Sequence, residues 1–452
     1  MTRNMEIEAS QIYQGFLEQI AASPLSTRNA LRVEIDFPAI SPLQWLSGQG
    51  GNARYYWRNR ERNIEMAGIG ESDIVIPETE IDAPGTLINR IRSRMAGSSQ
   101  NLRYYGGFRF HTGKVPNGRW HDFKAYRFVL PLLELCHVED RYTLACNLTA
   151  GHDRQSVMRT LRDVSFRANA NSNGLPAFSR RSDLPSPEGW ERLVNDGLSA
   201  IASNTLEKVV LARQSTFQAT HPIDPVALTQ RLAVDAQGAY LFCFEPASSR
   251  AFLGASPECL FKRDNNAIYS EALAGTRPRG DTDGAERAFE QELLQNAKEN
   301  REHQYVVEEI CRVLRRFCTH IDKPEAPKIM KLSRCQHLHT PITGALRQGA
   351  DDALLLEALH PTPAVGGVPQ KNAVRWILEN EPFERGIYAA PVGWVSADAA
   401  EFSVAIRSGL VREDRLTLYS GAGIIAGARP EDEWRELDAK LASFLAAIMK
   451  DA

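Results

Sequence analysis

The alternation of apolar and polar residues separates a strand-rich first part of the chain from a mixed second part. Over the first ~180 residues, period-two alternation between turn residues favours strands with some helix, as in Arg103–Phe110 and Tyr126–Leu148. A Ser-, Gly- and Pro-rich segment, Asn169–Pro187, is typical of a boundary loop. The sequence therefore predicts an N-terminal region, 1–180, and a second region, 186–450.

The second region begins with a helix signal. Ser186 and Pro187 are typical of a helix cap and first helical residue. Apolar residues then recur at helical spacing: Trp190, Leu193, Val194, Leu198 and Ile201. Strand-like runs follow at Lys208–Arg213, Tyr240–Glu245 and Ala251–Ala255, together with a hairpin that pairs Cys259–Arg263 with Ala267–Leu273.

The last part of the chain alternates helices and strands. We expect one long helix over residues ~285–319, from its apolar repeat. Arg385–Ser396 and Glu401–Val411 form a second hairpin candidate, and the strand Arg415–Ser420 runs into a glycine-rich segment. A final helix begins at Pro430.

Composition narrows the class of protein. Hydrophobic residues make up 43% and charged residues 24%, which is typical of a globular chain. The net charge of -3 gives no basic field for a nucleic acid, and no apolar run reaches the length of about eighteen residues needed to span a membrane. Seven cysteines without a CxxC pair favour a reducing compartment. We therefore expect a cytoplasmic protein that binds neither nucleic acid nor membrane.

Two Glu-x-x-Glu pairs are the most informative chemical pattern. Glu299 and Glu302 share one helical face, which continues as an apolar stripe through Val306 and Ile310, and Glu433 and Glu436 repeat the spacing on the final helix. Solvated surface charge is the alternative interpretation. Converging carboxylates without cysteine or histidine suit a hard divalent cation such as Mg²⁺.

A second pattern combines glycines with buried cations. Gly421, Ala422 and Gly423 begin a GxGxxxG run whose backbone N–H groups could cradle an anion, whereas too few residues follow for a dinucleotide-binding unit. Arg407 and Lys208 stand inside strand-like sequence. Such an arginine either pairs with an internal carboxylate or binds an anionic substrate, and a lysine near a core can act as a general base. For His337, His339 and His360 a structural role is the default.

Nine ordered segments, spread over roughly the last 250 residues, resemble the chorismate-utilising enzymes. They are LEKVVLARQ (206–214), FLGASPECLF (252–261), EALAGTRPRG (271–280), KENREHQYVVEEI (298–310), CQHL (335–338), LHPTPAVGGVP (359–369), ERGIYAAPVGW (384–394), EFSVAIRSGLV (401–411) and YSGAGIIAGARPEDEWRELDAK (419–440). The N-terminal ISPLQWLSGQ and ARYYWRNRE resemble isochorismate synthases of the menaquinone pathway more loosely.

The resemblance implies a ligand set and a substrate pocket. Mg²⁺ would be held by Glu302 and Glu433, with Glu299 and Glu436 assisting through water, and would bind the ring carboxylate of chorismate. The substrate would also be contacted by a set of residues from several segments: Thr276, His360, Tyr388, Arg407, Gly421, Ala422, Gly423 and Lys440. No glutamine amidotransferase subunit is expected.

Two positions sort the members of the family. Those that aminate the ring carry glutamine where this chain has Lys208, and aminodeoxychorismate synthases carry a nucleophilic lysine where it has Ala274. Water needs a base, so Lys208 indicates water addition at C2, with Glu258 protonating the C4 hydroxyl as it leaves. The resemblance thus implies an isochorismate synthase.

Three alternatives remain open from the sequence. A salicylate synthase uses the same groups, and Arg277-Pro278-Arg279 departs from several isochorismate synthases. The product could feed a siderophore rather than menaquinone, or the chain could bind chorismate without catalysis. For the fold, the resemblance implies one α/β (α+β) body like anthranilate synthase component I, in which two packed, mostly antiparallel sheets carry helices outside.

Overall fold

A computed structural model describes residues 3–23, 30–78, 84–99, 101–113, 118–166 and 174–448. Within these ranges twenty strands form one hydrogen-bonded network. The strand pairings in it are antiparallel. The expectation of an α/β body built on antiparallel strands is therefore confirmed.

The elements follow one another along the chain in two stretches. Up to the end of the predicted boundary loop they are α1 (Arg3–Ala22), β1 (Leu31–Asp36), α2 (Pro42–Ser47), β2 (Arg54–Arg58), β3 (Ile64–Val75), α3 (Pro84–Met95), β4 (Tyr104–Phe108), β5 (Tyr126–Val138), β6 (Arg141–Leu148), α4 (Arg154–Arg162) and β7 (Phe178–Leu184). After it come α5 (Pro187–Ala202), β8 (Lys208–Ala219), α6 (Pro225–Asp235), β9 (Tyr240–Ala247), β10 (Arg250–Ser256), β11 (Cys259–Asp264), β12 (Ala267–Pro278), α7 (Asp283–Gln295), α8 (Ala297–Phe317), β13 (Cys318–Asp322), β14 (Lys328–Lys331), β15 (Cys335–Leu346), α9 (Asp352–Leu359), β16 (Gly367–Val368), α10 (Gln370–Asn380), β17 (Pro391–Val395), β18 (Ala399–Val404), β19 (Ser408–Arg412), β20 (Arg415–Ile424) and α11 (Pro430–Ile448).

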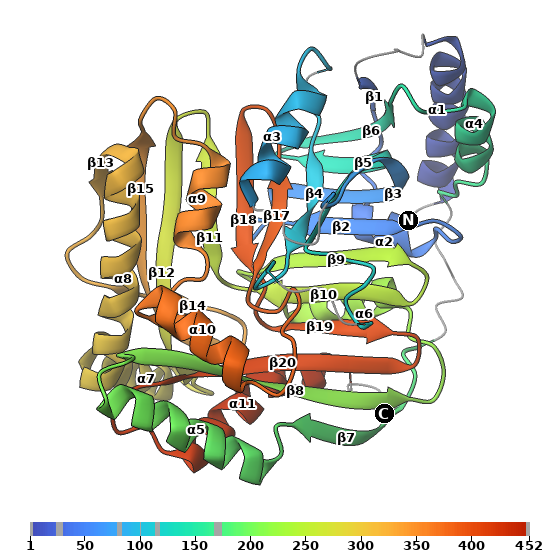
Figure 1. Ribbon diagram of the computed structural model, residues 1–452. Coiled ribbons are helices and arrows are strands. Elements are labelled where there is room, and N and C mark those ends of the chain that lie inside the picture. The colour runs from blue at the N-terminus through green and yellow to red at the C-terminus, as the bar shows by residue number, and fades with distance from the viewer. Residues whose placement is uncertain are drawn as a thin grey trace.

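Side-chain alternation along the strands builds a core on each face of the sheet. On β2, Tyr55 and Trp57 enter one buried cluster and Tyr56 enters the other, as the period of two requires. Helices α3, α5, α8, α9 and α10 contribute to the first cluster, and α1, α2, α4 and α6 to the second. In Figure 1 the strands β11, β12 and β15 stand at a steep angle to β2, β9 and β10, with α8 and α9 beside them.

The N-terminal strands belong to the same sheet as the rest of the chain. Strand β2 pairs with β9, where Tyr56 faces Cys243, and β4 pairs with β17, where Gly106 faces Gly393. The proposed division into 1–180 and 186–450 stays a prediction. None of the helices in the described ranges combines the length and the hydropathy that crossing a membrane requires.

The helix predicted over ~285–319 is two helices rather than one. Asn296 ends α7 and caps α8, because its side chain accepts a hydrogen bond from the Glu299 backbone N–H at 3.1 Å. Residues on both sides are good helix formers, so the periodicity hides the break. The break places Glu299 and Glu302 in the first two turns of α8.

Three other expectations are corrected. The segment predicted as a boundary loop contains β7, which pairs with β8, while its residues 169–173 lie outside the described ranges. Strand β17 does pair with β18, but β18 ends at Val404 and β19 pairs instead with β10 and β20. Arg407 therefore lies in the loop between β18 and β19, not inside a strand. It adopts a left-handed φ of 48° there.

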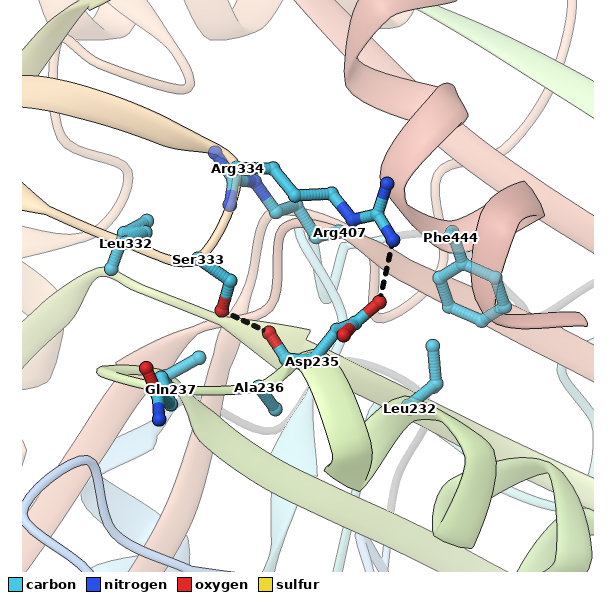
Figure 2. A pocket seen from close by; sticks show the side chains of 11 residues that line it. Leu232, Asp235, Ala236, Gln237, Leu332, Ser333, Arg334, Arg407 and Phe444 are labelled. Carbon is cyan, nitrogen blue, oxygen red and sulfur yellow. Dashed lines mark hydrogen bonds and ion pairs between the residues drawn. The ribbon is translucent and has the colours of Figure 1, made fainter. Parts of the chain in front are cut away.

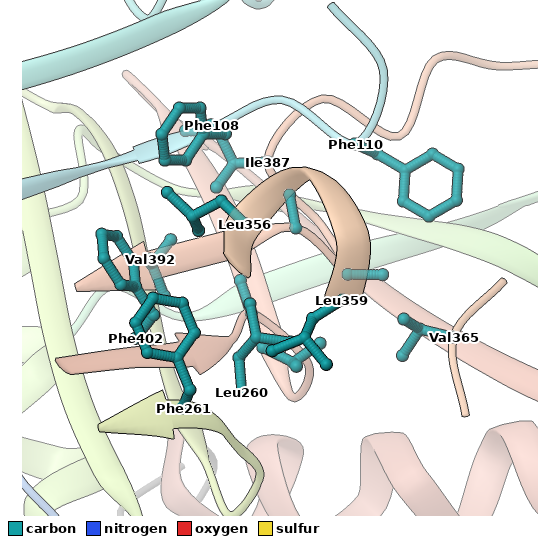
Figure 3. Packing of buried hydrophobic residues seen from close by; sticks show 14 of the residues in the cluster. Phe108, Phe110, Leu260, Phe261, Leu356, Leu359, Val365, Ile387, Val392 and Phe402 are labelled. Atoms are coloured by element: carbon teal, nitrogen blue, oxygen red, sulfur yellow. The ribbon is translucent and has the colours of Figure 1, made fainter. Parts of the chain in front are cut away.

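The short helix α9 is fixed by apolar contacts. Figure 3 shows Leu356 and Leu359 above Leu260, Phe261 and Phe402, which come from β11 and β18. These side chains are almost fully buried. The packing sets the direction of the segment after α9, which begins with His360.

Candidate active site

Lys208 and Glu302 meet at the start of two elements. Lys208 opens β8 with a fully buried side chain, and its Nζ donates a hydrogen bond to Glu302 Oε1 of α8 at 2.6 Å. Gly423 of β20 leaves room for both, since a Cβ there would lie 2.6 Å from Glu302 Oε1 and 3.1 Å from Lys208 Cε. A glycine is therefore required by the close approach of these side chains.

Each of the four predicted metal ligands has a cationic partner. The ion pairs are Lys208–Glu302 at 2.6 Å, Arg277–Glu299 at 2.9 Å, Lys298–Glu433 at 3.3 Å and Lys440–Glu436 at 2.6 Å. Burial, followed by the charge of Glu436, raises the pKa of Glu433 to about 7. Burial also raises the pKa of Glu299, with a further contribution from Glu302. Helices α8 and α11 thus bring the four carboxylates within electrostatic reach of one another.

This donor set fits a hard divalent cation. The predicted ligands are carboxylates, the oxygen donors that Mg²⁺ prefers. Three lysines and Arg277 neutralise these carboxylates, as a bound cation would. As the side chains stand in the described ranges, no three acidic, histidine or cysteine residues converge into a metal site. Binding of a cation would thus require these ion pairs to rearrange.

Glu258 lies between β10 and β11 and is 4% exposed. Burial, and then the neighbouring Glu271, raise its pKa to about 8, against the smaller opposing effects of Thr362, Lys208 and Lys440. Thr362 Oγ1 donates to its Oε1 at 3.5 Å. The carboxyl therefore keeps its proton at neutral pH and can donate it.

The glycine run begins inside strand β20, which ends at Ile424, and its last residues form a turn. Gly421, Ala422 and Gly423 lie inside β20, paired with Ala212, Leu211 and Val210 of β8. Ala422 is buried in the hydrophobic core. The binding of an anion by the backbone N–H groups of residues 421–423 stays a prediction.

Lys440 and Tyr388 meet at Gly421. Lys440 Nζ donates to the Gly421 carbonyl at 2.8 Å, and a Cβ on Gly421 would lie 2.8 Å from the Tyr388 hydroxyl. Burial raises the pKa of Tyr388 to about 12, so its hydroxyl is a neutral donor at physiological pH. One lysine ammonium and one neutral hydroxyl donor thus lie beside Gly421, and both are groups that can bind a carboxylate.

Arg407 and Thr276 are joined through His337. Arg407 Nη2 lies 3.0 Å from His337 Nε2, and His337 Nδ1 lies 3.0 Å from Thr276 Oγ1. Burial, followed by the charge of Arg407, lowers the pKa of His337 to about 3, so Nε2 of the neutral ring accepts from the guanidinium. Arg407 also lines a pocket of about 50 Å³, shown in Figure 2. Arg334 and Ser333 border this pocket and bond to Asp235.

His360 stands apart from these contacts. Its Nε2 lies 3.1 Å from the Phe110 carbonyl, and burial lowers its pKa to about 4. It borders a groove of about 760 Å³ between α9 and α10. Its connection to the rest of the candidate site is through the chain, because Thr362, two residues later, contacts Glu258.

Several residues at the site were not identified as candidates from the sequence. Lys298 precedes Glu299 directly, and its pairing with Glu433 depends on how α8 meets α11. Thr362 and His337 lie in the matched segments LHPTPAVGGVP and CQHL, which is the signal that could have identified them. Arg277 was noted only as a departure from related sequences, whereas it pairs with Glu299.

Comparison with known proteins identifies similar chains. The family model described as chorismate binding enzyme matches residues 16–449. Isochorismate synthase 2 of Arabidopsis thaliana is 36% identical over 79% of this chain, which spans 66% of that protein's length. Isochorismate synthase MenF of Bacillus subtilis is 33% identical, with 87% of this chain and 88% of that protein covered. The solved structure of MenF, the menaquinone-specific isochorismate synthase from Escherichia coli, superposes with a TM-score of 0.86 at 28% identity, covering 97% of this chain and 99% of the other.

Proposed function

The chain belongs to the chorismate binding enzymes, and from this premise we propose that it is an isochorismate synthase that converts chorismate to isochorismate. The observation that carries the proposal is the pairing of two buried groups with opposite tasks. Lys208 is a fully buried amine at the start of β8, and Glu258 is a carboxyl that keeps its proton at neutral pH. The curated relatives named isochorismate synthase support it.

The reaction follows from these two groups. Lys208, acting as the base, takes a proton from water as the water oxygen bonds to ring carbon C2. The two ring double bonds shift, the bond from C4 to its hydroxyl breaks, and Glu258 gives its proton to the leaving oxygen. Water is consumed and water is released, so the reaction is an isomerisation. Glu258 can act as the acid because burial and the charge of Glu271 keep it protonated at neutral pH.

Mg²⁺ fits the carboxylate cluster as the cofactor of this reaction. Glu302 and Glu433 would hold it, with Glu299 and Glu436 assisting, and it would supply positive charge for the ring carboxylate of the substrate.

The substrate carboxylates would be bound by the cations and hydroxyls around β20. Arg407, Lys440 and Tyr388 would hold them, with the backbone of residues 421–423. Thr276 and His360 would line the ring pocket. The absence of a glutamine amidotransferase partner stays a prediction.

The product decides the function. Purified protein, chorismate and Mg²⁺ should yield isochorismate by chromatography, without salicylate, pyruvate or an aminated ring. Salicylate with pyruvate at a comparable rate would make the chain a salicylate synthase, and no product would favour a non-catalytic chorismate-binding protein. A menaquinone role, supported by the bacterial MenF relatives, would be tested by restoring menaquinone to a strain that lacks its own enzyme.

The metal is tested through Glu302. Glu302→Gln should raise the Mg²⁺ concentration needed for half-maximal rate by at least about tenfold, since one charged ligand is lost. Glu325→Gln, in a surface turn, is the control. An unchanged Mg²⁺ titration of the folded Glu302 variant would remove that residue from the ligand set.

A further inference from the structure

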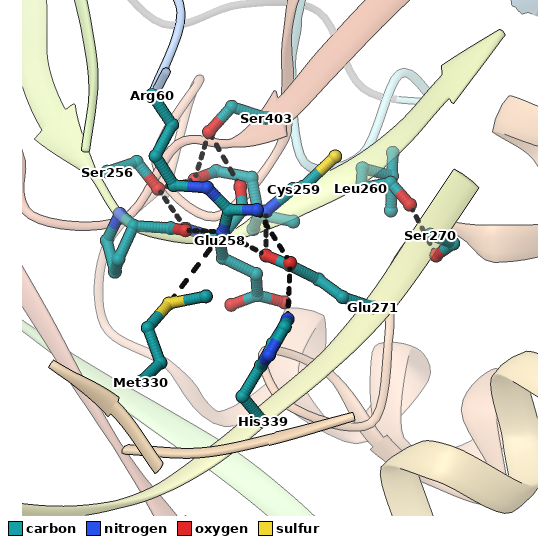
Figure 4. Close-up of polar contacts among 12 residues, drawn as sticks. Arg60, Ser256, Glu258, Cys259, Leu260, Ser270, Glu271, Met330, His339 and Ser403 are labelled. Atoms are coloured by element: carbon teal, nitrogen blue, oxygen red, sulfur yellow. Dashed lines mark hydrogen bonds and ion pairs between the residues drawn. The ribbon is translucent and has the colours of Figure 1, made fainter. Parts of the chain in front are cut away.

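A buried ion pair joins the N-terminal region to the segment that carries Glu258. Arg60 follows β2, is 10% exposed at its side chain, and donates to both oxygens of Glu271 on β12, at 2.6 and 2.8 Å. The same Arg60 Nη1 donates to the Pro257 carbonyl at 3.0 Å. Figure 4 shows Arg60 and Glu271 bonded to each other beside Glu258. Arg60 is therefore hydrogen-bonded to the peptide on the N-terminal side of Glu258.

Glu271 is hydrogen-bonded to the peptide on the C-terminal side of Glu258. Its Oε1 accepts a hydrogen bond from the Cys259 backbone N–H at 2.9 Å. The Glu258 carbonyl is itself held by the Ser403 hydroxyl at 2.8 Å and by the Val404 N–H at 3.1 Å. The peptides before and after Glu258 are thus both bonded to one Arg–Glu pair, which fixes the direction of its side chain.

The pair also places a negative charge near Glu258. Glu271 is fully buried at its side chain and accepts from Tyr269 at 2.8 Å, with His339 Nε2 at 2.9 Å. Burial alone would raise its pKa, but His339 and Arg60 outweigh burial and hold the pKa at about 2. Glu271 is therefore ionised at every pH at which the enzyme would work.

Groups from several elements act on Glu258. They are Glu271 from β12, Lys208 from β8, Lys440 from α11, Tyr388 from the loop before β17 and Thr362 from the segment after α9. Of these, Glu271 is the anion that favours the protonated carboxyl, whereas the two lysines favour the carboxylate. The proton on Glu258 thus depends on burial and on Glu271.

We propose that Arg60 and Glu271 are positioning residues for the general acid: the pair fixes the backbone on both sides of Glu258, and Glu271 places a negative charge beside it. The inference rests on the proposed function, in which Glu258 protonates the leaving hydroxyl. A purely structural ion pair would have the same burial, but it would not bond to both peptides that flank one ionisable residue.

The charge is tested with Glu271→Gln, which keeps the acceptor for Cys259. Loss of the negative charge favours ionisation of Glu258, so the alkaline limb of kcat should move down by roughly one pH unit. The matched control is Glu245→Gln. Glu245 is also buried, also binds an arginine at two oxygens, here Arg54 of β2, and also accepts a backbone N–H, that of Ser249. The Glu245→Gln variant should lose stability without moving the alkaline limb of kcat.

The positioning is tested with Arg60→Lys, which keeps the charge but cannot bond at once to Glu271 at two oxygens and to Pro257. Its kcat should fall about tenfold or more, with little change in KM for chorismate and no shift of the alkaline limb. Circular dichroism and thermal melts are to be used to check the folding of all three variants. If Glu271→Gln fails to fold, the Arg60→Lys result still decides the positioning.

The wild-type enzyme separates the two proposals. If it makes no isochorismate, the proposed function fails before any variant is measured. If the wild type is active but Glu271→Gln leaves the alkaline limb in place, or Glu245→Gln moves it equally, the charge role is overturned. A normal kcat for Arg60→Lys overturns the positioning role.

Discussion

At the scale of single residues, the site depends on a carboxyl and an amine held in unusual surroundings. Glu258 is nearly excluded from water, and its pKa of about 8 reflects burial first and the charge of Glu271 second. Lys208 is also buried and is bonded to Glu302 at 2.6 Å. Both groups would be ordinary surface charges without the strands around them.

The protonation of Glu258 predicts a pH dependence. A general acid works in its protonated form, so kcat should hold through neutral pH and fall as pH rises through about 8. The test is kcat measured from pH 6 to 9.5, with circular dichroism at each pH as a control for unfolding. A folded enzyme with constant kcat to pH 9.5 would contradict the assignment. Glu258→Gln should reduce kcat by about 10²–10⁴-fold.

The role of Lys208 predicts a loss of water addition. Lys208→Ala removes the proposed base and should lower kcat by about 10²–10⁴-fold, as loss of a positioned base does. Lys331→Ala is the comparison, because Lys331 lies at the surface and pairs with Glu286 and Glu290. Isochorismate formation measured by chromatography should persist in that variant. Full activity in Lys208→Ala would make the base assignment wrong.

At the scale of elements, the break between α7 and α8 and the glycines of β20 shape the site. Asn296 caps α8 so that Glu299 and Glu302 lie at its N-terminal end, near Lys298 and Lys208. A single continuous helix would have a different direction at this point. On β20, Gly423 leaves the space that Glu302 and Lys208 fill.

Gly423→Ala tests whether the close approach of Glu302 and Lys208 to β20 is needed for activity. Its Cβ would lie 2.6 Å from Glu302 Oε1, so Glu302 would be displaced at a cost of about 1–3 kcal/mol. We expect kcat/KM to fall at least about tenfold and the Mg²⁺ requirement to rise, while the fold persists. Gly284→Ala on α7, where a Cβ meets nothing within 4 Å, is the matched control. Unchanged Mg²⁺ titration and activity in Gly423→Ala would show that the close approach is not needed.

At the scale of the whole molecule, the N-terminal region completes the sheet around the catalytic segments. Strand β2 covers the edge of β9, β4 covers the edge of β17, and Arg60 reaches Glu271, 211 residues away. Trp57 and Tyr105 bury their rings in the same cluster as Phe242 and Phe402. The two predicted regions therefore depend on each other for burial of apolar surface.

A fragment of residues 186–452 should not fold on its own. It exposes the edges of β9 and β17 and loses the apolar partners of β2 and β4, so it should aggregate or lack a cooperative transition. Circular dichroism, gel filtration and a thermal melt check this, with the full chain as the control. A cooperative melt and a monomeric elution from the fragment would make 186–450 an independent domain.

Features that depend on neighbours along the chain can be predicted from the sequence. The Ser186–Pro187 cap, the strand-like sequence of Tyr126–Leu148 and the Glu-x-x-Glu spacings are local, and the first two are observed as predicted. Prediction from the sequence failed where local signals were silent or misleading. The sequence predicts a loop where β7 forms, because a strand's stability comes from its partner, here β8. The cap at Asn296 was hidden by helix-forming residues on both sides.

Which charged side chains pair with one another depends on the tertiary structure. Motifs indicate Lys208, Glu258 and the four glutamates as candidates. The ion pair of Glu433 with Lys298 joins distant segments, as do the hydrogen bonds of Arg60 and Glu271 to the peptides beside Glu258. The spacing of residues in a helix or strand fixes which side chains share a face, whereas the proton on a carboxyl depends on burial and on every charge brought near it. Those are properties of the packed sheet, which no local pattern contains.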